Sequence, residues 1–341
     1  MSEKILEIKN LSTSFFTHVG EVKAVRDVSF SVEEGEVLGI VGESGSGKSV
    51  TSLSIMRLLQ YPGRITSGEI LFKGKDLVKL SEAELRKIRG EKIAMIFQDP
   101  MTSLNPLYTI GNQIEEIILE HNKISKSEAR KRTIDMLKLV GIPAADRRVD
   151  SYPHEFSGGM RQRVMIAMAL ACKPDLLIAD EPTTALDVTI QAQVLRLIKQ
   201  LNSELNTATI LITHDLGVVA STCQKVIVMY GGQIMETGTD EDIFYNPRHP
   251  YTMGLLKSIP KNNLDSKERL IPIQGSTPDM LRPPTGCPFY PRCDYAMNIC
   301  RTKEPEYFKV SGCHTSKCWL MHEDAPKTPE YEAQKGGVSD V

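Results

Sequence analysis

The sequence contains no apolar stretch long enough to cross a membrane. One of its longest apolar runs, residues 164–172, has nine residues, whereas a membrane-spanning helix needs about 18. The N-terminus, Met1-Ser2-Glu3-Lys4, lacks the apolar core of a signal peptide. We therefore expect a protein that stays in the cytoplasm and reaches a membrane only through a partner.

The sequence also has no excess of charge of one sign. Its 41 Lys and Arg residues and 43 Asp and Glu residues give a formal net charge of −2. A general nucleic-acid binder usually carries a basic excess, so we expect no nucleic-acid partner. The 41% hydrophobic and 25% charged content is typical of a globular protein. Because 341 residues exceed one ordinary core, two domains are expected.

Cysteine is scarce over most of the chain and concentrated near its end. Cys172 and Cys223 are the only cysteines before residue 280, and both lie in apolar surroundings, where we expect them to be buried fillers. The other five of the seven fall within 32 residues. In a reducing compartment such clustering indicates metal binding more than disulfides. These five are Cys287, Cys293, Cys300, Cys313 and Cys318.

Apolar, β-branched runs alternate with helical patterns as far as about residue 240. Strands separated by helices imply a parallel sheet covered on both faces, whereas the first strands, joined by turns such as Glu33-Glu34-Gly35, indicate an antiparallel patch. The predicted strands are 5–10, 24–32, 37–41, 69–72, 93–97, 176–179, 209–212, 226–229 and 233–236. The predicted helices are 50–60, 82–89, 110–120, 126–140, 159–171, 189–205 and 216–221.

The pattern divides the chain into three regions. We predict a main domain over 1–260, in which about 100–160 forms a helical insert because it lacks strong strands. Short helices over 239–245 and 250–258 lead to a polar linker, 261–267, and then to a proline- and cysteine-rich module that ends near residue 322. The tail, 323–341, has five acidic and two basic residues and almost no apolar ones, so we expect it to be disordered.

A glycine-rich loop is the most informative motif. The stretch Gly42-Glu43-Ser44-Gly45-Ser46-Gly47-Lys48-Ser49 fits G-x-x-x-x-G-K-[ST] and directly follows the apolar run 37–41. A strand, a glycine turn and a helix N-terminus aim backbone N–H groups at one point, which suits a nucleotide's phosphates. Lys48 would reach the β- and γ-phosphates, and the Ser49 hydroxyl would ligate Mg²⁺. A chance glycine turn is the alternative, and it is uncommon between a buried strand and a helix.

Two further elements have the chemistry of a phosphate site. The apolar run 176–179 delivers Asp180 to a sheet edge, where it can hold Mg²⁺, and Glu181 can accept a proton from an attacking water. An ordinary strand ending in exposed acids is the alternative. Ser157-Gly158-Gly159 opens a helical pattern and would form another anion-binding helix N-terminus, or else a simple helix cap.

These motifs resemble the ATP-binding subunits of ABC transporters over about residues 5–260. The resemblance implies an α/β P-loop NTPase fold of the ABC type, with a mixed-sheet core, an antiparallel β patch and a helical insert. It implies Glu181 as the catalytic base, His214 as the switch histidine and Gln98 as the Q-loop glutamine. Mg²⁺ would be held by Ser49, Gln98 and Asp180. Residues implied in binding ATP are Phe15, stacking on adenine with Phe16 as the alternative, then Gly42, Ser44, Gly45, Ser46, Gly47, Lys48, Ser49 and Val50 of Walker A, Asp180 of Walker B, Ser157, Gly158 and Gly159 of the signature, and Asp187 of the D-loop.

Further segments resemble the oligopeptide and dipeptide group of import ATPases. They are Phe97 to Pro106, Ser157 to Arg163, with Met160 in place of the commonest glutamine, and His249-Pro250-Tyr251-Thr252. The resemblance implies an ATPase dimer, with a related but different chain as the usual partner. It also implies two membrane permeases, with one permease helix docking on the segment from Gln98 to about Ile114, and an extracytoplasmic solute-binding protein. An importer for nickel, a sugar or another small solute is the alternative, and a soluble ABC ATPase acting on nucleic acid or ribosomes is a more distant one.

The cysteine module is expected to bind metal. Cys287, Cys293, Cys300 and Cys318 have the spacing C-x5-C-x6-C-x17-C, without the C-x2-C pairs common at zinc sites. That spacing favours an iron–sulfur cluster over zinc, and the resemblance implies a [4Fe-4S] cluster. Cys313 could replace Cys318 as the fourth ligand, and His314 could favour zinc. Free thiols in a small packed domain remain the other alternative.

Overall fold

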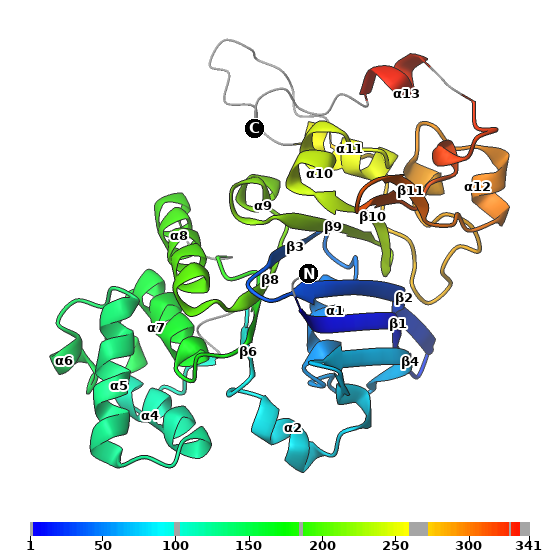
Figure 1. Ribbon diagram of the computed structural model, residues 1–341. Coiled ribbons are helices and arrows are strands. Elements are labelled where there is room, and N and C mark those ends of the chain that lie inside the picture. The colour runs from blue at the N-terminus through cyan, green and yellow to red at the C-terminus, as the bar shows by residue number, and fades with distance from the viewer. Residues whose placement is uncertain (1–2, 99–102, 184–186, 259–271, 327–328, 335–341) are drawn as a thin grey trace, which may run out of the picture. The chain divides into compact units, whose positions relative to one another are not determined.

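The protein is described from a computed structural model, shown in Figure 1, over residues 3–98, 103–183, 187–258, 272–326 and 329–334. The predicted linker 261–267, together with Ala185 and Leu186 of the D-loop segment, lies outside these residues. The chain forms two compact units that each combine several segments. The first unit comprises Met1–Leu6, Ser31–Val37 and Leu71–Ile212, and the second comprises Glu7–Phe30, Leu38–Ile70 and Thr213–Val341. This division differs from the domain boundaries predicted near residues 260 and 322, which stay predictions.

Three parallel strands form the sheet of the first unit. They lie in the order β8 (Ala208–Thr213), β7 (Leu176–Asp180), β6 (Ile93–Ile96), and both pairs run parallel. Every residue of β7 and β8 is buried. Continuous burial of this kind is typical of a parallel strand covered on both faces, so the predicted parallel sheet is confirmed.

The helical insert lies in this first unit, where α4, α5 and α7 pack against one another. Its helices begin at side chains that accept hydrogen bonds from backbone N–H groups, as Thr109 does for α4 and Ser125 for α5. Over the described residues, the helices and turns of the unit are η1 (Leu77–Lys79), α2 (Glu82–Ile88), α4 (Ile110–His121), α5 (Lys126–Leu139), α6 (Ala145–Arg148), η2 (Pro153–Glu155), α7 (Gly158–Leu170) and α8 (Val188–Leu205).

The second unit carries the strand that leads into the glycine-rich loop. This strand, β3 (Val37–Val41), is buried throughout and pairs in parallel with β9 (Lys225–Tyr230). The remaining neighbours are antiparallel: β9 with β10 (Gln233–Thr239), β10 with β12 (His314–Ser316), and β12 with β11 (Phe308–Ser311). The hairpin of the cysteine module therefore extends the same sheet that carries the glycine-rich loop.

A further sheet has the order β2 (Gly20–Glu33), β1 (Lys4–Thr17), β4 (Gly63–Phe72), β5 (Lys75–Asp76), in which β4 and β5 are antiparallel. Both β1 and β2 are longer than predicted. In the part of the second unit that the structure describes, the helices and turns are α1 (Lys48–Ile55), α9 (Leu216–Thr222), α10 (Asp240–Tyr245), α11 (Pro250–Lys257), η3 (Tyr290–Arg292), α12 (Asn298–Thr302), η4 (Trp319–Met321) and α13 (Pro329–Gln334).

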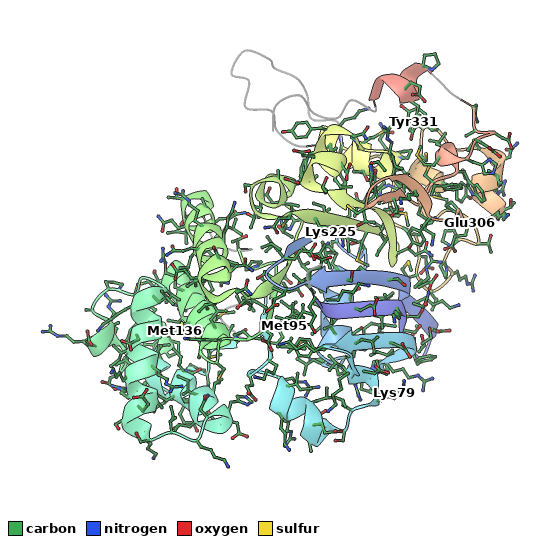
Figure 2. All side chains as sticks on the ribbon, in the orientation of Figure 1. Lys79, Met95, Met136, Lys225, Glu306 and Tyr331 are labelled. Atoms are coloured by element: carbon green, nitrogen blue, oxygen red, sulfur yellow. The ribbon has the colours of Figure 1, made fainter. Side chains whose placement is uncertain are left out.

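Two expectations need correction. The helix predicted over 50–60 ends at Ile55, because Arg57 adopts a left-handed conformation with φ of 50°. The tail after residue 322 is not disordered throughout, since α13 forms within it. Tyr331 of this helix, labelled in Figure 2, is 1% exposed and donates a hydrogen bond to the Arg248 carbonyl at 2.6 Å.

Candidate functional site

The glycine-rich loop lies between β3 and α1 and needs glycine for steric reasons. Gly42 has φ of 151°, and a Cβ atom there would lie 2.2 Å from the Met229 carbonyl oxygen. Gly47 has φ of 102°, and its Cβ would lie 2.7 Å from the Ala24 carbonyl oxygen. Both conformations are unfavourable for other residues, so the backbone of this loop is fixed by the sheet around it.

The Lys48 side chain folds back onto the glycine-rich loop. Its ammonium group donates hydrogen bonds to the carbonyl oxygens of Gly42 at 2.7 Å and Glu43 at 3.0 Å. The side chain is buried, and Ser49 follows it in the first turn of α1. An ammonium group at a helix N-terminus surrounded by backbone N–H groups has the chemistry of a phosphate-binding site.

In the first unit, two of the predicted catalytic residues meet. Asp180 ends β7 and is buried, and Glu181 follows it in a left-handed conformation with φ of 47°. The Gln98 amide donates a hydrogen bond from Nε2 to Oε2 of Glu181 at 2.8 Å. Positive φ at a non-glycine residue costs about 1–3 kcal/mol and is concentrated at functional sites. The backbone here fixes the direction of the glutamate.

The predicted signature begins α7. The Ser157 hydroxyl accepts a hydrogen bond from the Met160 N–H at 3.4 Å, which is the N-cap arrangement. A Cβ atom on Gly159 would lie 2.6 Å from Ile190, so this glycine allows α7 and α8 to approach. A Cβ atom on Gly158 would meet nothing within 4 Å among the described residues. Gly158 therefore faces open space that a ligand or partner can occupy.

The remaining predicted residues lie at the ends of helices and strands or on β1. Asp187 accepts a hydrogen bond from the Ile190 N–H at 3.0 Å and caps α8, while His214 is exposed directly after β8. Phe15 packs against Gly63, and Phe16 is exposed beneath the Arg64 guanidinium, 3.9 Å from its ring centre. The glycine-rich loop, Phe15 and His214 belong to the second unit. Gln98, the signature, Asp180, Glu181 and Asp187 belong to the first.

Four cysteines gather in the second unit. Cys287, Cys293, Cys300 and Cys318 line one pocket. Burial raises the pKa of the Cys287 thiol to about 11 and that of the Cys293 thiol to about 12. Among the described residues, no group of three or more His, Cys, Asp or Glu side chains has the arrangement of a metal site.

The two alternative ligands of this module lie elsewhere. Cys313 is exposed at the turn between β11 and β12, whereas Cys318 is buried in the pocket. His314 is fully buried and its Nε2 lies 2.8 Å from Oε1 of Glu236, a carboxylate that also accepts the N–H groups of Arg248 and His249. Cys313 is thus outside the pocket and His314 contacts Glu236, which favours Cys318 as the fourth ligand of the module.

Comparisons with known proteins show the family of the chain. Residues 25–184 match the ABC transporter family, and residues 235–300 match the oligopeptide/dipeptide transporter C-terminal region. The chain is 58% identical to the oligopeptide transport ATP-binding protein OppD of Bacillus subtilis over 97% of this chain and 93% of that one. It is 56% identical to the dipeptide transport ATP-binding protein DppD of the same organism, over 95% and 96%. The chain belongs to the oligopeptide and dipeptide transport ATP-binding proteins of the ABC transporter family.

Solved structures agree on the fold. The dimeric ABC transporter cassette MJ0796 superposes with a TM-score of 0.62 at 32% identity, covering 69% of this chain and 98% of that one. Membership of this family makes the chain an ABC-type ATPase. No helix in the described part of the chain is both long and apolar enough to cross a membrane.

One residue that lines the cysteine pocket, His249, was not indicated by the sequence. His249 is buried and lines the pocket, and burial lowers its pKa to about 3, so its ring is neutral. Its Nδ1 accepts the Tyr251 N–H at 3.0 Å, which leaves the proton on Nε2, an atom without a hydrogen-bond partner among the described residues. The His249-Pro250-Tyr251-Thr252 segment served only as a family marker in the sequence. No local signal indicated that its histidine faces the cysteines.

Proposed function

We propose that this chain hydrolyses ATP to drive the import of dipeptides and oligopeptides through an ABC transporter. The observation that carries the proposal is the close identity to OppD and DppD, which spans both the ATPase domain and the C-terminal region. The chain would act at the cytoplasmic face of the membrane, paired with a second and different ATPase chain on two permeases. An extracytoplasmic binding protein would deliver the peptide. No nucleic-acid partner is proposed.

The proposed roles within the ATP site follow from residue chemistry. Lys48 and the N–H groups of the glycine-rich loop bind the phosphates, Phe15 stacks on adenine, and Ser49, Asp180 and Gln98 hold Mg²⁺, which neutralises phosphate charge when bound. Glu181 takes the proton of the attacking water, and His214 supports the γ-phosphate. Ser157, Gly158 and Gly159 complete the site of the partner chain across the dimer, as the open space at Gly158 supports.

We propose that a permease helix docks on the helical insert. A hollow of about 940 Å³ opens beside α4 and is lined by Tyr108, Asn112, Glu116 and Met168 among others. Tyr108 is 55% exposed, and Leu107, the residue before it, is 81% exposed. Exposed large apolar side chains beside a hollow are typical of a protein interaction site. Residues 99–102 of the predicted docking segment lie outside the described residues.

We propose further that Cys287, Cys293, Cys300 and Cys318 hold a [4Fe-4S] cluster, with zinc as the alternative. Three observations support a fit: the four thiols line one pocket, the competing Cys313 lies outside it, and the Nε2–H group of His249 lacks an acceptor there. Thiolate and sulfide sulfur atoms accept such hydrogen bonds. Iron, sulfide and zinc analysis after anaerobic purification decides between the cluster, a single zinc ion and an empty module.

Peptide uptake is the direct test of the proposed function. The chain, its partner ATPase and two permeases are reconstituted in vesicles with the binding protein, and ATP-dependent uptake of a labelled dipeptide and an oligopeptide is measured. Peptide uptake that requires ATP supports the proposal. Uptake of nickel or another small solute without peptide uptake would show that the alternative substrate class is correct. Co-purification with ribosomes or DNA in place of permeases would contradict a transport role altogether.

A further inference from the structure

An arginine of the cysteine module reaches into the glycine-rich loop. Arg292 ends η3, directly before Cys293, and its side chain is 4% exposed. Its guanidinium donates two hydrogen bonds to the Glu43 carboxylate, from Nη1 to Oε2 at 2.6 Å and from Nη2 to Oε1 at 3.0 Å. Glu43 is the second residue of the glycine-rich loop. The two residues are 249 positions apart in the sequence.

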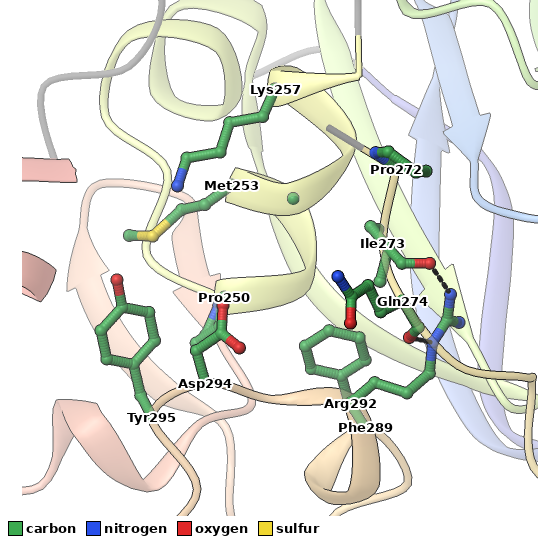
Figure 3. Close-up of a pocket in the computed structure, with 11 residues that line it drawn as sticks. Pro250, Met253, Lys257, Pro272, Ile273, Gln274, Phe289, Arg292, Asp294 and Tyr295 are labelled. Atoms are coloured by element: carbon green, nitrogen blue, oxygen red, sulfur yellow. Dashed lines mark hydrogen bonds between the residues drawn. The ribbon is translucent and has the colours of Figure 1, made fainter. Parts of the chain in front are cut away.

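All five N–H donors of Arg292 have acceptors. Besides Glu43, Nη1 donates to the Tyr230 hydroxyl at 3.1 Å, Nη2 to the Ile273 carbonyl at 3.0 Å, and Nε to the Gln274 carbonyl at 2.8 Å. Figure 3 shows the two carbonyl contacts at the edge of a pocket of about 340 Å³. These contacts, led by the Glu43 carboxylate, raise the pKa of Arg292. A planar guanidinium that donates a hydrogen bond from every N–H group has one orientation. It therefore fixes the orientation of the Glu43 carboxylate as well.

Glu43 is fixed by three different groups. Its carboxylate accepts from Arg292, its N–H donates to the Tyr251 hydroxyl at 2.8 Å, and its carbonyl accepts from Lys48 Nζ at 3.0 Å. Tyr251 belongs to α11 and packs with Tyr230 and Phe289, at ring distances of 4.6 and 5.3 Å. The C-terminal part of the chain thus holds the side chain and the N–H of the residue whose carbonyl orients the phosphate-binding lysine.

We propose that Arg292 is a positioning residue of the ATP site, acting through Glu43 on the glycine-rich loop and on Lys48. A phosphate loop binds tightly when its N–H groups and ammonium group are ordered before the nucleotide arrives. The free-energy cost of ordering these groups then does not reduce the free energy of nucleotide binding. Arg292, which belongs to the cysteine module, keeps the loop ordered by holding Glu43. This role of Arg292 rests on ATP binding by the family, and it does not depend on what the four cysteines hold.

If Arg292 acted only through its charge, the two substitutions would change nucleotide affinity differently than if it positions Glu43. Removing Arg292 leaves the Glu43 carboxylate unpaired beside the phosphate site, where it repels a nucleotide. Removing the charge of Glu43 leaves a cation there, which attracts one. If charge alone matters, Arg292→Ala weakens nucleotide binding and Glu43→Gln strengthens it. If positioning matters, both substitutions weaken binding, because each breaks the same bidentate contact.

The test is a double-mutant cycle on the Kd of ATP, measured by calorimetry on the full chain without Mg²⁺ so that hydrolysis does not interfere. We expect Arg292→Ala and Glu43→Gln each to weaken binding about 5-fold to 100-fold, the usual range for coupling between sites. The double variant should be no weaker than the worse single variant, because both changes break one contact. Arg292→Lys should fall between, since an ammonium group cannot make the bidentate contact.

Arg301→Ala is the matched control, since Arg301 is an exposed arginine of the same module. It should leave the Kd unchanged. A Kd for folded Arg292→Ala within twofold of the wild type would overturn the proposal, and so would tighter binding by Glu43→Gln. If Arg292→Ala does not fold, Glu43→Gln and Arg292→Lys decide by the same criterion. Iron and zinc content are measured on each variant, so that failure of the metal proposal is seen separately.

Discussion

The Gln98 amide holds the carboxylate of Glu181 through a hydrogen bond of 2.8 Å from Nε2 to Oε2. Glu181 itself has φ of 47° and donates its N–H to the Ile212 carbonyl at 2.9 Å. The backbone of Glu181 and the Gln98 amide together fix the direction of this side chain.

Glu181→Gln should reduce ATP hydrolysis by at least about 100-fold, because an amide cannot accept the proton of the attacking water. ATP binding should persist, since the substituted side chain still offers an oxygen to Gln98 and removes no phosphate ligand. Phosphate release is measured with the partner ATPase present, and nucleotide binding is measured separately. Glu204→Gln, on exposed α8 surface, is the control. Wild-type turnover by Glu181→Gln would contradict the assigned base.

Gly158→Ala should separate activity from stability. The Cβ atom meets nothing within 4 Å in the described chain and φ is not positive, so the fold should gain about 0.4–1 kcal/mol from a less flexible unfolded state. Hydrolysis by the assembled dimer should fall, since the added methyl group occupies space proposed for the partner's nucleotide. Gly159→Ala is the contrast: its Cβ lies 2.6 Å from Ile190 and should cost stability. Unchanged dimer activity in Gly158→Ala would argue against a role for this glycine in the site.

Local patterns predicted the strands that lead to the ATP site and the residues at their ends. β3 is buried throughout, and a five-residue apolar run such as 37–41 that ends in a glycine turn is typical of a buried strand, so its bounds were predicted correctly. The far end of β1 was missed because Thr13 and Ser14 are polar although they are buried, and the start of β2 was missed because it contains Gly20 and charged residues. The contact between Arg292 and Glu43 joins residues 249 positions apart, so no periodic pattern in the sequence predicts it. Long-range polar contacts of this kind depend on the packing of whole elements.

The fourth cysteine ligand can be tested by removing one thiol at a time. Cys318→Ser should lose the bound metal, because the Cys318 thiol is buried in the pocket shared with Cys287, Cys293 and Cys300. Cys313→Ser should keep the wild-type metal content, since Cys313 is exposed at a turn. Metal analysis and the absorption spectrum of anaerobically purified variants give the answer. Loss of metal in Cys313→Ser with retention in Cys318→Ser would reverse this assignment.

The buried pair of His314 and Glu236 should matter for stability. Both side chains are fully buried and lie 2.8 Å apart, linking β12 of the module to β10. His314→Ala leaves a buried carboxylate without its side-chain partner, so the free energy of unfolding should fall by about 3–5 kcal/mol. Denaturant unfolding measures this loss. His322→Ala, at an exposed contact with Asp324, should cost at most about 1 kcal/mol. Equal losses in the two variants would show that burial of the His314 pair contributes nothing.

The C-terminal helix α13 should contribute to stability although its surrounding sequence is polar. Tyr331 is 1% exposed, stacks edge-on against Tyr295 at 5.4 Å and donates to the Arg248 carbonyl at 2.6 Å. Tyr331→Phe removes only the hydrogen bond and should cost about 1 kcal/mol, whereas Tyr331→Ala also empties a packed site and should cost about 3–5 kcal/mol. Tyr61→Ala is the control, because Tyr61 is 97% exposed. If the tail contributes nothing to stability, Tyr331→Ala unfolds at the wild-type midpoint in urea. Because Tyr331 is buried in α13, we expect a measurable decrease in that midpoint.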